Sequence, residues 1–498
     1  EAEMRRVNVF DWEDDVKGFG GIMRRGGFDC VVGNPPYLKI HHLVEQGSKV
    51  LDYLNDKYES SGSGGYDIYI AFVERGTKIL RENGKFGFIL PHKFFNASYG
   101  KQLRNYISRG KLLSEIVHFK DKQVFEHVST YTCLLFLSKS NQKEFDYLQI
   151  PDDCSPKEFI DEIRSNRSNF ISTYDLTGVT EKTWFFVDRK YTKLLQKLSS
   201  GSKTLGELTT NIFKGFDTGA DKIYFMEYID EDDTNFILFS KELQKPVKIE
   251  KRLMKKSLKG KQIDRFYSSF KDIYVLFPYN ILDGKVSIIE ESVLKKEFVN
   301  GYNYLKSLKS VLERRNKGRM KGTKWYAFTY PRNMLLYKKP KIFTPYNAFR
   351  NTFCFDENGG YYFTTGVAGA YGLLFASSPC DIKYFLGVLN SSIVNLFIKQ
   401  IGTCLQGGYY SYEKRFIEKL PISSIDFSNP AEKAQHDKLV SLVDNMLELK
   451  RKYHEMRMEQ DKELYERQIK IVDAQIDRLV YDLYGLTGEE IKVVEEHA

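Results

Sequence analysis

Four consecutive residues, Asn34, Pro35, Pro36 and Tyr37, have types and an order that could do chemistry. They follow an apolar run at residues 29–32, which predicts a short buried strand. The two prolines predict a rigid turn with free carbonyls, because proline fixes φ and has no N–H to donate. An amide, stiff carbonyls and a ring therefore meet at the carboxyl end of a strand, where ligands bind in open α/β sheets. From these residues alone, a plain Pro-Pro turn remains the alternative.

The order Asn-Pro-Pro-Tyr after a strand resembles the catalytic motif of the DNA adenine-N6 methyltransferases. The resemblance implies that the Asn34 side-chain oxygen and the Pro35 backbone oxygen accept from the two N–H bonds of the adenine amine. That amine is a poor nucleophile because its lone pair is conjugated, and two acceptors draw it toward a tetrahedral geometry. Tyr37 would stack on the adenine, which must first be flipped out of the duplex. S-adenosylmethionine (SAM), an activated methyl donor, is the implied cofactor, so no strong general base is needed.

Composition limits the possible classes of function. The chain has 498 residues, which suggests about three domains, and 42% of them are hydrophobic, enough for sizeable cores. Its net charge of +9 is compatible with a nucleic-acid partner without being diagnostic of one. The six cysteines form no Cys-x-x-Cys pair and lie beside no spaced histidines, so no metal site is predicted. Several cysteines fall in apolar runs and no apolar run reaches a transmembrane length, which predicts a cytoplasmic protein with no membrane partner.

The pattern after Tyr37 alternates between helix and strand. Apolar positions predict a helix that opens at Tyr66, followed by several strands. These strands are expected at residues 86–91, 112–119 and 131–138, the last in an antiparallel edge hairpin. The order resembles the second half of the adenine methyltransferase fold, which implies an α/β, partial Rossmann-like, SAM-dependent methyltransferase domain at residues 1–140. By the same resemblance, Phe125 is the second ring that clamps the adenine opposite Tyr37, with a core aromatic as the alternative.

Two residues near the start, Asp11 and Trp12, close a strand predicted at residues 7–10. The resemblance implies that Asp11 accepts from the adenine amine of SAM and that Trp12 packs on its ring, with Asn34 completing the cofactor contacts. A strand-terminating acid is the alternative. The glycine-rich SAM loop should precede residue 1, so we expect a C-terminal portion of a longer protein that lacks most of a SAM site by itself.

Residues 141–180 are charged and irregular, which predicts a linker. A helix expected at residues 205–213 leads to Lys214 and a polar loop, and this arrangement resembles the start of the target-recognition domain of fused restriction–modification enzymes. That domain, of the TaqI-like specificity type and of α/β class, is implied at residues 181–425. The resemblance is strong again at residues 390–392 and at the Gly-Gly-Tyr-Tyr run at residues 407–410.

Basic residues and aromatic rings in this second domain suit phosphate contacts and stacking on DNA. The densest basic run spans residues 314–324, and the Gly-Gly-Tyr-Tyr loop presents two rings. The predicted DNA contacts are Lys214, Arg314, Arg315, Lys317, Arg319, Lys321, Lys324, Tyr409 and Tyr410. A solvated basic face and a domain-core turn are the alternatives for the two segments.

The last part of the chain, residues 426–498, carries two apolar stripes at helical spacing, and Gly485 stops the second. This pattern predicts a helical hairpin that acts as a spacer on the recognition domain. A dimerisation coiled coil is the alternative, although the heptads are short and interrupted.

The resemblance, which covers nearly the whole chain, implies the methyltransferase and specificity portion of a type IIG restriction–modification enzyme from a prokaryotic cytoplasm. The expected reaction is site-specific methylation of adenine N6 in double-stranded DNA, with any nuclease, and the remainder of the methyltransferase, upstream of residue 1. A DNA-binding specificity module without catalysis is the alternative in a different class, and an RNA methyltransferase is a third reading.

Overall fold

The computed structural model describes residues 11–12, 14–40, 48–61, 65–125, 130–151, 153–184, 186, 189–268, 272–405, 407–456 and 458–496. The chain forms two compact units, Glu1–Lys193 and Leu194–Ala498. Helix α8 (Arg189–Ser199) spans the division between them. The strand predicted at residues 7–10 lies outside the described residues.

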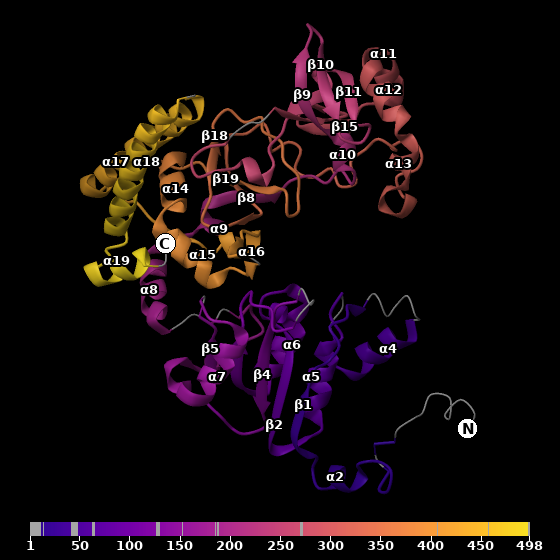
Figure 1. The fold of residues 1–498 in the computed structure, drawn as a ribbon, viewed down its shortest axis with the longest axis vertical. Coiled ribbons are helices and arrows are strands. Elements are labelled where there is room, and N and C mark those ends of the chain that lie inside the picture. The colour runs from indigo at the N-terminus through magenta and orange to yellow at the C-terminus, as the bar shows by residue number, and fades with distance from the viewer. Residues whose placement is uncertain are drawn as a thin grey trace. The chain divides into compact units, whose positions relative to one another are not determined.

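The N-terminal unit is built on a six-stranded sheet in the order β1-β2-β4-β3-β5-β6 (Figure 1). Its strands are β1 (Phe28–Gly33), β2 (Leu80–Pro91), β3 (Leu113–His118), β4 (Thr132–Ser138), β5 (Glu144–Gln149) and β6 (Ile171–Asp175). β1 is parallel to β2 and β3 is parallel to β5, whereas β4 is antiparallel to both β2 and β3, and β6 is antiparallel to β5. The strands β1, β2, β3 and β5 therefore end at one edge of the sheet, called the carboxyl edge below.

The N-terminal unit also contains helices, which confirms the predicted α/β class. They are α2 (Gly20–Arg24), α4 (Ser48–Lys57), α5 (Tyr69–Lys78), α6 (Lys101–Arg109) and α7 (Pro156–Asn166). The inner face of α5 buries Ile70 and Val73 in the same apolar cluster as Leu90 of β2 and Leu135 of β4. Burial of such side chains stabilises the unit by about 1.5–3 kcal/mol each, relative to exposure.

The predicted linker at residues 141–180 is wrong, because β5, α7 and β6 lie within it and belong to the sheet and its cover. α7 begins with a capping box, in which the Ser155 hydroxyl accepts from the Glu158 N–H and the Glu158 carboxylate accepts from the Ser155 N–H. Phe159 on α7 is fully buried. The predicted edge position of β4 is also wrong, since β4 lies between β2 and β3.

Strand β1 positions the predicted catalytic turn and is less buried than its apolar sequence predicts. Val32 is 79% exposed, and among the described residues β1 pairs only with β2. Gly33 lies against Phe88, where a Cβ atom would come within 2.8 Å of the ring. A side chain at residue 33 would therefore force either the Phe88 ring or the β1 backbone to shift.

The C-terminal unit contains a five-stranded sheet (β11-β10-β9-β13-β12), a four-stranded sheet (β18-β16-β19-β8) and smaller sheets β14-β15, β17-β21-β20 and β22-β7. Its strands are β7 (Ser202–Thr204), β8 (Thr209–Lys214), β9 (Phe225–Glu231), β10 (Asn235–Ser240), β11 (Lys245–Glu250), β12 (Met254–Lys256), β13 (Ile273–Leu276), β14 (Tyr279–Leu282), β15 (Lys285–Ile288), β16 (Lys341–Pro345), β17 (Asn347–Ala348), β18 (Cys354–Asp356), β19 (Ala370–Phe375), β20 (Cys404–Leu405), β21 (Tyr409–Ser411) and β22 (Pro421–Ser423). Its helices are α9 (Leu205–Leu208), α10 (Asp221–Tyr224), α11 (Glu291–Glu297), α12 (Val299–Ser307), α13 (Lys309–Arg314), α14 (Ile382–Leu389), α15 (Ser392–Ile401), α16 (Lys414–Ile417), α17 (Pro430–Glu455), α18 (Glu459–Leu483) and α19 (Gly488–Glu495).

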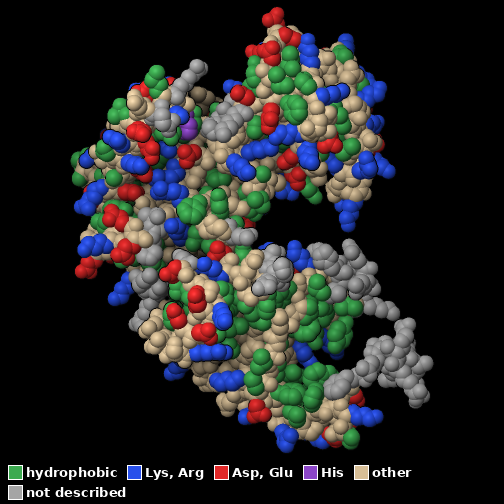
Figure 2. Space-filling model, in the orientation of Figure 1, with side chains coloured by type: hydrophobic (Ala, Val, Ile, Leu, Met, Phe, Trp, Pro, Cys, Tyr) green, Lys and Arg blue, Asp and Glu red, His purple; other side chains and the backbone are tan. Residues whose placement is uncertain are grey.

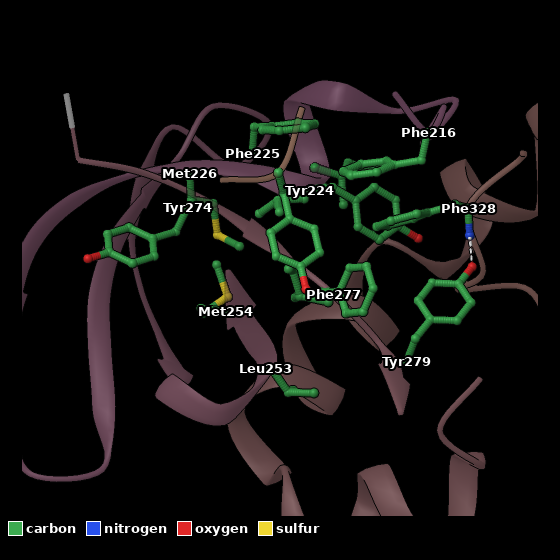
Figure 3. Packing of buried hydrophobic residues seen from close by; sticks show 14 of the residues in the cluster. Phe216, Tyr224, Phe225, Met226, Leu253, Met254, Tyr274, Phe277, Tyr279 and Phe328 are labelled. Atoms are coloured by element: carbon green, nitrogen blue, oxygen red, sulfur yellow. Dashed lines mark hydrogen bonds between the residues drawn. The ribbon is translucent and has the colours of Figure 1, made fainter. Parts of the chain in front are cut away.

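An aromatic cluster holds the loops of this unit together (Figure 3). The ring of Phe216 stacks on that of Phe328 at 4.7 Å, and the Phe328 N–H donates to the Tyr279 hydroxyl at 2.7 Å, the contact dashed in Figure 3. Phe216 and Phe328 are both fully buried. The loop after β8 and the loop before β16 are therefore fixed to one core.

The predicted C-terminal helical hairpin is confirmed, with α17 and α18 side by side in Figure 1. Pro430 occupies the first turn of α17, and Gly485 follows α18 with a left-handed φ of 59°. The predicted helix at residues 205–213 is wrong in its second half, because residues 209–214 form β8 and pair with β19. Among the residues that the structure describes, no helix is both long and apolar enough to cross a membrane.

Candidate functional site

The Asn34–Tyr37 turn leaves the sheet at its carboxyl edge, directly after β1. Asn34 and Pro36 are exposed, Pro35 is buried and Tyr37 is half-buried. Within the described part of the chain, the Asn34 amide has no hydrogen-bond partner. Its side-chain oxygen is therefore available to accept a hydrogen bond from a ligand.

Three hydrogen bonds fix this turn to its neighbours. The Tyr37 hydroxyl donates to the Ile89 carbonyl of β2 at 3.1 Å, while the Ile68 N–H donates to Leu38 O and the Ile40 N–H to Tyr66 O, both at 2.8 Å. Burial, with a smaller effect of the nearby Cys133 thiol, raises the pKa of Tyr37 to about 12. Tyr37 is therefore a neutral, oriented ring near neutral pH.

The start of α5 adds a polar cluster next to the turn. The Tyr99 hydroxyl donates to the Asp67 carboxylate at 3.0 Å and lies 3.2 Å from the Tyr69 hydroxyl. Lys39 in the turn and Asp67 form an antiparallel bridge. These contacts connect the turn to the loop before α6, so the carboxyl edge is rigid on this side.

A buried histidine pair lies at the same edge and was not predicted from the sequence. His92 Nδ1 lies 2.7 Å from His118 Nε2, and His118 Nδ1 lies 2.7 Å from the Tyr147 hydroxyl. Burial lowers the pKa of His92 to about 4 and holds that of His118 well below its usual range. Both rings are therefore neutral at pH 7 and join the ends of β2, β3 and β5.

Asp11 and Trp12 lie at the opposite end of β1 from Asn34. The Trp12 ring is 5.3 Å from that of Phe19, which is in turn 5.1 Å from Phe28 at the start of the strand. Six residues of strand separate Phe28 from Asn34, a span of about 20 Å. The structure therefore does not bring the predicted cofactor residues together, because Asp11 and Trp12 face the amino edge of the sheet.

Phe125 follows β3 and is half-buried, with its neighbour Val124 packed against the cluster around Phe119 and Phe159. β3 ends at the carboxyl edge, as β1 does, so the loops that carry Phe125 and Tyr37 leave the sheet at the same edge. This placement is compatible with the expected stacking of Phe125 on the adenine opposite Tyr37, and that stacking stays a prediction.

In the C-terminal unit, the basic run forms an exposed loop after α13. Asn316, Lys317 and Gly318 have left-handed φ angles of 49°, 57° and 82°, which together make a single left-handed turn. The exposed basic residues at the end of α13 and on this loop are Arg314, Lys317, Arg319, Lys321 and Lys324. In Figure 2, Lys and Arg side chains (blue) gather along the side of the unit formed by α12 and α13.

Arg315 differs from its neighbours, and its predicted contact with DNA is wrong. It is 7% exposed, and its guanidinium donates to the carbonyls of Leu312, Thr218 and Trp325. Nε, Nη1 and Nη2 thus each donate a hydrogen bond inside the protein. Arg315 instead fixes the basic loop to the loop after β8.

Lys214 and Tyr409 are exposed, and Tyr410 is half-buried. Lys214 ends β8 and its ammonium lies 6.0 Å from the Tyr371 ring, whereas the Tyr409 ring meets Phe349 edge-on at 6.2 Å. Tyr409 begins β21, next to Gly407 and Gly408, which both have positive φ. Among the described residues, no group of three or more His, Cys, Asp or Glu side chains is placed to hold a metal ion.

Two segments of the chain match known family models. Residues 1–125 match the Eco57I restriction-modification methylase family, and residues 255–422 match the TaqI-like C-terminal specificity domain. The chain is 28% identical over 490 residues to the type II restriction enzyme and methyltransferase RM.Eco57I of Escherichia coli, covering 94% of this chain and 48% of that protein. It is 21% identical over 491 residues to the type II methyltransferase M.BstVI of Geobacillus stearothermophilus, covering 94% of this chain and 75% of that protein.

A solved structure shares the fold. The type IIL restriction-modification enzyme MmeI, determined in complex with DNA, superposes with a TM-score of 0.56 at 10% identity, over 94% of this chain and 56% of that one. The chain therefore spans about half the length of RM.Eco57I and of MmeI.

Proposed function

Since this chain is homologous to type II restriction–modification enzymes and methyltransferases and carries a TaqI-like specificity domain, we propose that it methylates adenine N6 in duplex DNA. The observation that carries the proposal is the exposed, unpartnered Asn34 amide on a fixed turn at the carboxyl edge, with the oriented Tyr37 ring beside it. SAM is the proposed methyl donor.

The chemistry assigned to this turn needs two acceptors and a ring. The Asn34 side-chain oxygen and the Pro35 carbonyl would accept from the adenine amine and draw its lone pair out of conjugation. Tyr37 would stack on the flipped base, and its ring is already held in place by the bond to Ile89 O. Because the turn is fixed by hydrogen bonds to β2 and to the segment before α5, little reorganisation is needed when the base arrives.

The residues present fit SAM in part. SAM supplies the methyl group when bound, and Asn34 lies at the strand end where such a group would approach the base. Asp11 and Trp12 face the other end of β1, so no cofactor contact is assigned to them. We propose that residues N-terminal to Glu1 supply the remaining cofactor contacts. The exposed side of β1, with Val32 79% exposed, and the length difference from RM.Eco57I support this proposal.

Duplex DNA is the proposed partner of the C-terminal unit. The exposed basic residues after α13 suit phosphate contacts, and Lys214 and Tyr409 suit contacts from the loops of the same unit. In the enzyme type proposed, type IIG, a nuclease shares the polypeptide, and it would lie upstream of residue 1.

The test is a methyl-transfer assay with labelled SAM and a duplex library, on the protein extended N-terminally to the length of RM.Eco57I. Asn34→Ala should lower the rate on the order of 100-fold or more and leave DNA affinity unchanged, because the amide would contact the reacting groups and not the DNA backbone. Asn141→Ala is the matched control, since Asn141 is exposed at the opposite edge of the sheet, between β4 and β5. Normal methylation by Asn34→Ala would refute the catalytic assignment.

The methylated atom is read by digesting the product to nucleosides and identifying the modified base by mass. N6-methyladenine is expected. A methylated cytosine, or methyl transfer to RNA in competition with duplex DNA, would contradict the proposal. Sequence-selective DNA binding without methyl transfer from the extended protein would instead favour a specificity module that has no catalysis of its own.

A further inference from the structure

The loop between Phe328 and Met334 presents an arginine with unusual surroundings. The Arg332 guanidinium lies 4.7 Å from the centre of the Tyr330 ring, over its face. Arg332 is exposed and Tyr330 is 43% exposed. Such a stack orients the planar guanidinium and leaves its N–H groups pointing away from the ring.

Other arginines of the C-terminal unit also stack on rings, but their N–H groups are used. Arg252 lies over Phe298 and pairs with Glu297 at 3.7 Å, and Arg415 lies over Phe416 and pairs with Glu413 at 2.9 Å. Arg265 and Arg315, also on rings, are buried and donate to Asp473 and to carbonyls, respectively. Among the described residues of the C-terminal unit, Arg332 is the stacked arginine that is exposed and has no ion pair.

The chain segment around Arg332 contains no acidic residue that could pair with its guanidinium. No Asp or Glu occurs between Glu313 and Asp356, although this segment contains many Lys and Arg residues. Asp217, whose backbone pairs with that of Tyr330, accepts from the Gly219 N–H at 2.8 Å. Among the described residues no acid pairs with Arg332, so a negative or acceptor-rich partner has to be supplied by another molecule.

The platform under Arg332 is rigid. Tyr330 and Asp217 exchange two backbone hydrogen bonds of 3.0 and 3.1 Å, and the Arg332 N–H donates to Tyr330 O at 3.0 Å. Asn333, with a left-handed φ of 56°, donates from its side chain to Lys214 O at 3.0 Å. The stacked pair is thus fixed on one side to the loop after β8 and on the other to the end of β8, which limits the entropy lost when it binds.

We propose that Arg332, stacked on Tyr330, reads a guanine in the major groove of the target duplex and so specifies one base pair of the recognition sequence. This inference rests on the proposed function of the chain. A planar guanidinium fork matches the O6 and N7 acceptors of guanine, which is the commonest specific contact in the major groove. A phosphate could also accept from Arg332, and the experiment separates the two, because a phosphate carries no sequence information.

The test is selection of bound duplexes from a randomised library by the full chain, followed by affinity measurements on the selected sequence and its single-base variants. In Arg332→Ala, the preference for guanine at one position should fall on the order of 10- to 100-fold, with the rest of the motif retained. Arg332→Lys should recover part of the preference, since lysine lacks the planar fork. Tyr330→Phe should keep it and Tyr330→Ala should weaken it, because the ring is the platform.

Two control variants define the alternatives. Arg319→Ala should weaken binding to all sequences alike, as loss of a phosphate contact does, and Arg252→Ala should change neither affinity nor selectivity. If Arg332→Ala behaves like Arg319→Ala, or selects the unchanged motif, Arg332 does not read a base. If the unmodified chain selects no duplex sequence at all, the proposed function itself fails, which is a distinguishable result.

Discussion

The buried histidine pair predicts that the N-terminal unit loses stability in mild acid. The Tyr147 hydroxyl donates to Gln149 Oε1, so it must accept from His118 Nδ1–H, and His118 Nε2 must then accept from His92 Nδ1–H. Protonating His118 would place two N–H groups against each other across 2.7 Å. The positive charge of Lys120 disfavours that proton further. The folded unit therefore requires both rings to be neutral.

The magnitude follows from the pKa of His92, which burial lowers to about 4, against about 6.5 in an unfolded chain. Between these values the unfolded chain binds more protons than the folded one, so the free energy of unfolding falls as the pH falls. The contribution is fully present above about pH 6.5 and is lost as the pH drops toward 4. At roughly 1.4 kcal/mol per pKa unit, His92 alone contributes about 3 kcal/mol.

The assay is urea unfolding of the N-terminal unit from pH 7 to pH 4.5, followed by the fluorescence of Trp12 and Trp184 in a Trp325→Phe background, since Trp325 belongs to the other unit. The side chain of His92→Asn keeps a donor near the position of Nδ1 and cannot titrate. The free energy of unfolding of this variant should therefore fall less steeply with decreasing pH than that of the unmodified chain, with a slope smaller by about 1 kcal/mol per pH unit between pH 6 and pH 5. His454→Asn, an exposed histidine of the C-terminal unit, is the control. Equal slopes for the unmodified chain and His92→Asn would refute the neutral-pair reasoning.

Two further predictions concern the stability of the C-terminal unit. Gly219→Ala should destabilise it by about 2–3 kcal/mol, because Gly219 has a φ of 67° and a Cβ atom would lie 2.0 Å from Thr329 Oγ1. Thermal unfolding would measure this loss. Gly366→Ala is the control and should cost only about 1 kcal/mol, because Gly366 has a φ of 83° but open space around it. Arg315→Met should cost about 3 kcal/mol in urea unfolding, because three carbonyls lose their donor. The exposed Arg314→Met should change stability by less than about 0.5 kcal/mol, and an equal effect of the two arginine variants would contradict the assignment of Arg315.

The sequence was most informative where one periodicity dominates a segment. Alternating and continuous apolar runs located β1, β3 and β4 to within a residue or two, and helical stripes located α17 and α18. The Asn34 turn could be predicted because its prolines dictate the backbone whatever the surroundings. Register and strand order could not be predicted, since β4 reads the same at an edge as between β2 and β3.

The missed helix α7 did carry a local signal. Ser155, Pro156 and Glu158 form the start of a capping box with proline in the first turn, and that signal outweighs the charged composition of the segment. The histidine pair carried no local signal in the sequence. His92 follows β2 and His118 ends β3, and only the strand order β2-β4-β3 brings these two strand ends near each other. A single histidine at a strand end is otherwise an ordinary core residue.

The basic run shows most clearly why composition alone cannot assign a DNA contact. Arg314 and Arg315 are neighbours of the same type, yet one is exposed and the other is buried, because α13 ends between them and the chain turns left-handed at residues 316–318. That turn directs Arg315 inward to the Thr218 and Trp325 carbonyls and leaves Lys317 and Arg319 outside. Left-handed φ at Asn316 and Lys317 costs about 1–2 kcal/mol per residue. The hydrogen bonds of Arg315, which hold the basic loop against the loop after β8, offset this strain. Arg315 thus contributes to the basic surface through the backbone that it fixes, and not through its own charge.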